Sequence, residues 1–269
     1  MTEEFAIIGK PLPKVDALGK VTGQTQYADD LFLPRMLYAK LLGCHHPHAR
    51  IRSVNTAIAE ALPGVEAVLT GKDLPVKYGI LPVSQDETAL AVIKGRFVGD
   101  PIAAVAALDE ETAERALDLI EVEYEALPSY LSMEEALTQN GEPVHDYGDR
   151  GNIHKLVSLE FGDPEAGFAE ADYVREDTFF YQGNTHLPLE QHAALAQYTP
   201  DGKLTLWSST QTPHYVHRAL SKTLGLPVSR VRVIATPVGG GFGGKSDPFP
   251  HEIVASKLAM VTGRPVKVT

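Results

Sequence analysis

The stretch that decides the fold reads Val231-Arg-Val-Ile-Ala-Thr-Pro-Val-Gly-Gly-Gly-Phe-Gly-Gly-Lys-Ser246. Apolar residues over 231–235 predict a buried strand, and five of the 23 glycines of the chain follow at positions 239–244. Glycine permits positive φ angles and lets a ligand approach backbone N–H groups without a Cβ in the way. We therefore expect residues 239–246, the glycine loop, to bind a ligand.

Two phosphate-binding patterns also match the glycine loop. Gly239-x-Gly241-x-x-Gly244 fits the dinucleotide fingerprint, and Gly239-x4-Gly244-Lys245-Ser246 fits the P-loop. Both patterns need a helix that opens directly at the loop. Here Asp247-Pro-Phe-Pro250 follows instead, and its prolines cannot lie in the body of a first helical turn. A nucleotide-binding loop is therefore the less favoured alternative.

Composition limits the class of protein. The 269 residues suggest about two domains, and 24 basic against 35 acidic residues give a net charge of −11, which disfavours nucleic acid and anionic membranes as partners. Cys44 is the single cysteine, so this chain alone can build neither a disulfide framework nor an iron–sulfur cluster. We expect no signal peptide and no membrane span, and therefore a cytoplasmic protein.

Hydrophobic patterns predict an alternation of strands and helices. Strands are expected over 36–43, 50–55, 65–70, 102–108, 120–124, 173–181, 193–198, 204–208, 231–235 and from 265 onward. Helices are expected over 56–62, 109–119, 213–224 and 251–261, with a short one after the capping box Ser132-Met-Glu-Glu135. Residues 102–124 form a β-α-β unit in this interpretation, and residues 79–94 a long loop.

Several independent motifs resemble the xanthine dehydrogenase/aldehyde oxidase family of molybdenum hydroxylases. The glycine loop, about 28 residues after Ser209-Thr-Gln211, resembles the family's molybdopterin-contacting segment. Further motifs occur in family order: Gly19-Lys-Val-Thr-Gly23, Tyr27-Ala-Asp-Asp30, His46-Pro-His-Ala-Arg-Ile51, Leu62-Pro-Gly-Val65, Leu69-Thr-Gly-Lys-Asp73 and Val98-Gly-Asp-Pro-Ile-Ala-Ala-Val105. Within the family, Tyr78-Gly-Ile-Leu-Pro82 and Phe161-Gly-Asp163 resemble large subunits of the 4-hydroxybenzoyl-CoA reductase type.

The resemblance implies an α+β fold in two parts. An α/β-hammerhead domain is expected over residues 15–128, followed by a linker over 129–151. Residues 152–269 are then expected to form the first, incomplete part of a molybdopterin-binding domain.

The resemblance also assigns roles to residues. The side-chain amide of Gln211 would donate to an oxygen ligand of molybdenum, and Gly240, Gly241, Phe242 and Gly243 would contact the cofactor, so that Gln211 and Phe242 lie beside the metal. Ser246 would face the substrate where purine-oxidising members have a glutamate, and a serine cannot supply that charge-assisted hydrogen bond. The family's general-base glutamate would lie beyond residue 269, which leaves no catalytic residue within this chain.

The expected function is that of part of a molybdenum-cofactor subunit. Its oxidoreductase would hydroxylate, or reductively dehydroxylate, an aldehyde, a heteroaromatic ring or an aromatic acyl-CoA. The cofactor would be molybdopterin in its cytosine dinucleotide form, with iron–sulfur and FAD groups on partner subunits and the rest of the molybdenum subunit as a further partner. The rival hypothesis is a non-catalytic assembly module with the same fold.

Other polar residues are expected to be structural. A strand-end turn accounts for His45, His46 and His48, and a small buried side chain for Cys44. His186, Glu190 and His192 are expected to pair near the cofactor or a domain interface rather than to bind a metal. His214 and His217 lie one helical turn apart after Gln211 and are expected to be solvated or hydrogen-bonded.

Overall fold

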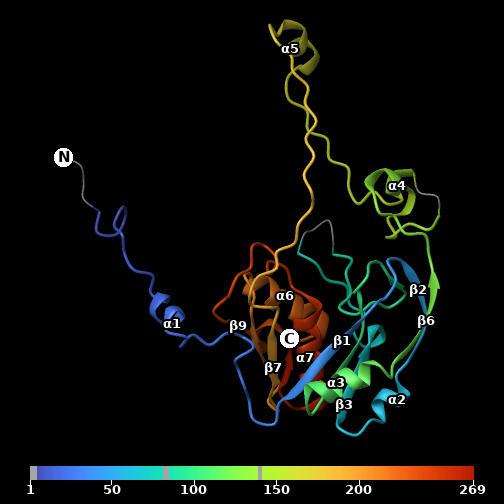
Figure 1. Ribbon diagram of the computed structural model, residues 1–269, viewed down its shortest axis with the longest axis vertical. Helices are drawn as coiled ribbons and strands as arrows, with labels where there is room; N and C mark the ends of the chain where they lie inside the picture. Colours follow the sequence, from blue (N-terminus) through green and yellow to red (C-terminus); the bar gives the residue numbers. More distant parts are fainter. Residues whose placement is uncertain (1–4, 81–84, 139–140) are drawn as a thin grey trace.

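The protein is seen in a computed structural model that describes residues 5–80, 85–138 and 141–269. Its centre is a seven-stranded mixed sheet in the order β3-β5-β1-β10-β7-β8-β9 (Figure 1). These strands are β1 (Leu37–Gly43), β3 (Val65–Thr70), β5 (Pro101–Ala107), β7 (Ala194–Tyr198), β8 (Leu204–Ser208), β9 (Val231–Ala235) and β10 (Val266–Val268). The predicted strands at these places are confirmed.

Helices cover both faces of this sheet because the central strands alternate between two apolar cores. Ala104 and Ala106 of β5 face the larger core, which includes α6 (Pro213–Leu224) and α7 (Pro250–Thr262). Ala103 and Val105 face a smaller core with α2 (Ala57–Glu60) and α3 (Glu110–Leu117). This period of two is what a strand buried on both faces requires.

Local signals set the ends of these helices. Both α6 and α7 begin with a proline at the first turn, where the missing N–H costs nothing. Both end at a glycine in the left-handed region, Gly225 at φ 66° and Gly263 at φ 63°. The side chain of Asp109 accepts from Thr112 N and caps α3, as predicted.

A second, three-stranded sheet in the order β4-β2-β6 lies at one end of the molecule. It contains β2 (Ala49–Asn55), β4 (Lys94–Gly95) and β6 (Glu121–Ala126). The predicted β-α-β unit over 102–124 is therefore wrong in one respect, since β5 belongs to the large sheet and β6 pairs with β2. The connection through α3 carries the chain from one sheet to the other.

The large sheet joins the two halves of the chain. Strand β1 pairs in parallel with β10, with Leu37 opposite Val266 and Ala39 opposite Val268. Strands β3, β5 and β1 come from the first 107 residues, and the other four come from residues 194–268. The core is thus continuous across the boundary that we expect between a hammerhead domain and a cofactor domain.

Two segments extend away from this body (Figure 1). One is N-terminal and includes α1 (Ala17–Val21); the other, which we call the arm, is residues 155–185 with α5 (Pro164–Glu170) at its tip. The strand predicted over 173–181 is wrong, because within the described ranges no strand pairs with this stretch. Its apolar residues remain exposed, with Phe179 at 90% and Phe180 at 89%.

The remaining elements are short. Helix α4 (Met133–Thr138) follows the predicted capping box, in which Glu135 N donates to the Ser132 hydroxyl and Leu131 N donates to the Glu135 carboxylate. Single 3-10 turns occur at η1 (Gly71–Asp73), η2 (Gly148–Arg150) and η3 (Val228–Arg230). Residues 81–84 of the expected long loop, which hold Leu81 and Pro82 of one family motif, lie outside the described residues.

Candidate functional site

The sheet topology brings Gln211 next to the glycine loop. Strands β8 and β9 are parallel neighbours, and Ser208 at the end of β8 lies opposite Ala235 at the end of β9. The segments that follow both strands therefore leave the sheet at the same edge. The first contains Gln211 and the second is the glycine loop, so two segments that lie apart in the sequence meet here.

Hydrogen bonds join these segments and orient the side chain of Gln211. The backbone N–H of Gln211 donates to the Lys245 carbonyl at 2.9 Å, and Lys245 N donates to Gln211 Oε1 at 3.2 Å. The Ser246 hydroxyl adds a bond of 3.4 Å to the same oxygen. With the oxygen occupied, the Gln211 NH₂ group donates to no acceptor in the described part of the chain, and the residue is exposed.

The backbone of the glycine loop offers further free donors. Gly240, Phe242 and Gly243 have φ of 114°, 52° and 88°, which turns the chain sharply. None of the N–H groups of residues 240–243 is hydrogen-bonded to an acceptor among the described residues. Phe242, at 75%, and Gly243 are exposed, whereas Gly241 is buried, so the N–H groups of Phe242 and Gly243 lie where a ligand with several oxygens can reach them.

Close packing explains two of the glycines. A Cβ on Gly241 would lie 2.5 Å from Gln211 Oε1, and a Cβ on Gly244 would lie 2.7 Å from Cγ of His186. Both distances are shorter than any real carbon contact, so the side chains of Gln211 and His186 occupy the space that larger residues would need. The loop is thus held against the protein at both positions.

A buried ion pair lies under the glycine loop. Lys245 Nζ is 2.8 Å from Glu190 Oε2 and donates at 2.9 Å to the Glu190 carbonyl, and Gly239 N donates to the same carboxylate oxygen at 2.7 Å. The side chain of Lys245 is 1% exposed and that of Glu190 is 9% exposed. From the sequence we expect Glu190 near the cofactor or a domain interface, without Lys245 as its partner. The signal that could have identified Lys245 is its position directly after the glycines.

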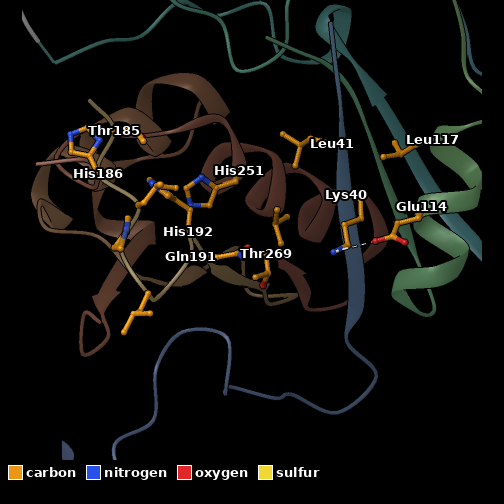
Figure 2. A pocket seen from close by; sticks show the side chains of 14 residues that line it. Lys40, Leu41, Glu114, Leu117, Thr185, His186, Gln191, His192, His251 and Thr269 are labelled. Atoms are coloured by element: carbon orange, nitrogen blue, oxygen red, sulfur yellow. Dashed lines mark ion pairs between the residues drawn. The ribbon is translucent and has the colours of Figure 1, made fainter. Parts of the chain in front are cut away.

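A cavity of about 910 Å³ is lined in part by residues 185–189, 191 and 192. Figure 2 shows His192 and His251 at one side of it and the Lys40–Glu114 ion pair at the other. The rings of His192 and His251 meet edge to face, with centroids 5.4 Å apart. Burial lowers the pKa of both imidazoles, that of His251 to about 3, so both are neutral at pH 7.

The described residues contain no cluster of three or more histidine, cysteine, aspartate or glutamate side chains able to hold a metal ion. His217 Nε2 donates to carbonyls of Val228 and Val231, whereas His214 is exposed. Cys44 is buried, as expected, and His45, His46 and His48 lie in a bend between β1 and β2. None of the helices described here is long and apolar enough to cross a bilayer.

The nucleotide-binding alternatives lack the helix that they require. Helix α7 begins at Pro250, and residues 247–249 separate it from the glycine loop. Its N-terminal N–H groups therefore do not open directly at Gly244, as they would in a P-loop or a dinucleotide fold. The free donors of the loop are backbone groups of residues 240–243.

Two family models match consecutive parts of the chain. Residues 22–128 match the model of the aldehyde oxidase and xanthine dehydrogenase a/b hammerhead domain, and residues 144–269 match that of the molybdopterin cofactor-binding domain. The nicotinate dehydrogenase large molybdopterin subunit of Eubacterium barkeri is 40% identical over 268 residues, which are 100% of this chain and 62% of that protein. The xanthine dehydrogenase molybdenum-binding subunit of Escherichia coli O157:H7 is 36% identical, over 95% of this chain and 35% of its own.

Solved structures give the same result. Quinoline 2-oxidoreductase from Pseudomonas putida 86 superposes with a TM-score of 0.86 at 33% identity, over 96% of this chain and 34% of its own. The chain therefore spans 62% of the nicotinate dehydrogenase subunit and about a third of the other two relatives. Two consecutive domain matches, together with relatives aligned along nearly the whole chain, place it in the xanthine dehydrogenase/aldehyde oxidase family of molybdenum hydroxylases.

Proposed function

We propose that this chain is part of the molybdenum-cofactor subunit of an oxidoreductase, and that Gln211 and residues 240–243 hold the cofactor. The observation that carries the proposal is the set of free donors at one edge of the sheet. It comprises the Gln211 NH₂ group and four consecutive backbone N–H groups, with Phe242 exposed beside them. Such a set suits a ligand rich in oxygen and nitrogen acceptors.

The residues present fit a molybdopterin. The glycines leave a surface without side chains against which a flat ring system can lie, and Phe242 offers an aromatic face at its border. When bound, the cofactor supplies the two-electron redox chemistry that substrate hydroxylation needs. The chain itself binds and orients: Gln211 donates an uncharged hydrogen bond, and the loop amides position the rest of the group.

The substrate proposal rests on Ser246 and on the relatives. The Ser246 hydroxyl bonds to Gln211 Oε1 and supplies no charge, so a purine held by a carboxylate at this position is disfavoured. The substrate classes that remain as candidates are an aldehyde, an aromatic acyl thioester and a heteroaromatic ring. The names of the nicotinate and quinoline enzymes favour a heteroaromatic ring.

The partners that we propose are an iron–sulfur subunit, an FAD subunit and the remaining part of the molybdenum subunit, which would carry the general-base glutamate. The arm supports the last of these, because Leu156, Phe161 and Tyr181 are 83–85% exposed although apolar. Relatives that are much longer contain additional polypeptide to cover such a surface. We further propose the cytosine dinucleotide form of the cofactor and a cytoplasmic location.

The test is to purify the chain from its own host together with all bound subunits, and to measure pterin fluorescence after denaturation and molybdenum by mass spectrometry. We expect about one pterin and one molybdenum per copy of this chain. A complex that lacks both would overturn the proposal and favour the non-catalytic assembly module. Binding of ATP or NAD that is lost in Lys245→Ala would instead favour a nucleotide site.

A further inference from the structure

Glu190 bonds to both ends of the glycine loop at once. Its Oε2 accepts from Gly239 N, where the loop begins, and from Lys245 Nζ, just before the loop ends at Ser246. The free donors of residues 240–243 lie between these two attachments. Because the side chains of Lys245 and Glu190 are buried, water competes little with the carboxylate for these donors.

The bonds continue from Lys245 to Gln211. The backbone N–H of Lys245 fixes Gln211 Oε1, which leaves the Gln211 NH₂ group as the outward donor. A displacement of Lys245 would therefore turn the amide that the proposed function places beside molybdenum. No hydrogen bond joins Glu190 to that amide among the described residues, and Lys245 is the residue that is bonded to both.

Glu190 also has an unused acceptor. Its Oε1 is buried and has no hydrogen-bond partner among the described residues. A buried carboxylate oxygen without a donor is costly if the residue serves stability alone. This cost is accounted for if Glu190 has a further role, which is to hold the glycine loop.

We infer that Glu190 is a positioning residue, which acts through Lys245 to fix the glycine loop and the direction of the Gln211 amide before the cofactor binds. The inference rests on the proposed function for its cofactor-binding consequence. Its structural part, the fixed loop, concerns this chain alone. It predicts that the Glu190–Lys245 ion pair matters more for the loop than for the rest of the fold.

A matched ion pair elsewhere in the chain supplies the control. Lys94 is 3% exposed, and its Nζ donates to Glu142 Oε1 at 3.2 Å and to the Pro143 carbonyl at 2.7 Å. It therefore resembles Lys245 in burial and in its two acceptors. Because Lys94 belongs to the small sheet, we expect its loss to leave the glycine loop unaffected.

The first experiment is hydrogen–deuterium exchange on the chain without cofactor, for Glu190→Gln, Lys245→Met, Lys94→Met and the wild type. We expect the hydrogen-bonded amides of Gly239 and Lys245 to exchange at least tenfold faster in the first two variants, while amides of β8 and α7 keep their protection. Lys94→Met should leave loop exchange unchanged. Equal loop exchange in Glu190→Gln and the wild type would overturn the inference.

The second experiment measures pterin and molybdenum in complexes purified with their partners. Glu190→Gln and Lys245→Met should retain at most a fifth of the wild-type content, Lys94→Met should retain all of it, and Glu190→Asp, which keeps the charge, should retain an intermediate amount. Full retention in Glu190→Gln would contradict the inference. A wild-type complex without pterin would overturn the proposed function, whereas the exchange result would still decide whether Glu190 fixes the loop. Should Glu190→Gln fail to fold, Glu190→Asp serves in both experiments.

Discussion

Gly241→Ala should separate damage to the site from damage to the fold. The added Cβ would lie 2.5 Å from Oε1 and 2.6 Å from Cδ of Gln211, whereas an ordinary carbon–oxygen contact is about 3.3–3.6 Å. The φ of Gly241 lies outside the left-handed region, so the backbone accepts alanine without strain. Relief therefore comes from the side chain of Gln211, which must move by about 1 Å.

The expected magnitudes differ for stability and for catalysis. Moving Gln211 Oε1 by about 1 Å breaks its bond to Lys245 N, now 3.2 Å, and the loss of one such bond costs about 1 kcal/mol. The same movement displaces the NH₂ group from the position proposed for the cofactor. A misplacement of about 1 Å in a positioned group lowers kcat by about 100-fold.

Gly225→Ala is the matched control. Gly225 ends α6 at φ 66° with no atom within 4 Å of a new Cβ, so alanine there costs about 1 kcal/mol of backbone strain away from the site. We would measure urea unfolding of both variants, and kcat and molybdenum content of both in the purified complex. If both variants lose stability and activity alike, or if Gly241→Ala keeps full activity, the role assigned to Gln211 is refuted.

Three further predictions concern stability. Burial raises the pKa of the Glu252 carboxyl from 4.5 to about 7, so the folded chain binds more protons than the unfolded chain between these values. Stability present at pH 4.5 should be lost as the pH rises to 7, by up to about 3 kcal/mol, and urea titrations of Glu252→Gln should lack this loss. Burial lowers the pKa of His251 from 6.5 to about 3, so its contribution is present above pH 6.5 and falls as the pH falls toward 3. In His251→Gln the unfolding free energy should fall less between pH 6.5 and pH 3 than in the wild type. An equal fall in both would contradict the lowered pKa of His251. Asp109→Ala removes the 2.7 Å bond to Thr112 N and should lower the unfolding free energy by about 1 kcal/mol, a value read from the urea midpoint.

Elements with strong local signals could be predicted from the sequence. The strands Val65–Thr70 and Leu204–Ser208 and the helix Pro213–Leu224 have the predicted bounds, because turn residues, prolines and glycines mark their ends. The sheet to which a strand belongs could not be predicted in this way. β5 and β6 follow each other through one helix, yet they lie in different sheets, since pairing depends on residues far away in the sequence.

The arm illustrates a second limit. Its stretch 173–181 has the composition of a strand, with several aromatic and β-branched residues. A strand also needs a neighbour that accepts its backbone hydrogen bonds, and within the described residues it has none. The pattern therefore identifies a segment with the composition of a strand and does not identify a strand that would pair with it.

At the site, the sequence predicted which segments meet and could not predict which atoms remain free. The spacing of Gln211 and the glycine loop indicated their proximity through a family resemblance. The orientation of the Gln211 amide depends on Lys245 N, and the position of Lys245 depends on a carboxylate 55 residues earlier. A lysine after a glycine run resembles a phosphate ligand in sequence, and only its burial beside Glu190 assigns it to the loop.

The glycine loop has two opposing requirements, because it must be open to a ligand and must also be ordered, and the Glu190–Lys245 ion pair helps to meet the second. Five glycines give a surface open to a ligand, but glycine also loses the most conformational entropy when it is fixed, so a glycine loop is ordered poorly by its own residues. Contacts from outside must then hold it, and here they act at its two ends through Glu190 and Gln211. Because the ends are fixed and the amides between them stay free, part of the ordering cost is met before a ligand arrives, which strengthens binding without adding a contact to the ligand.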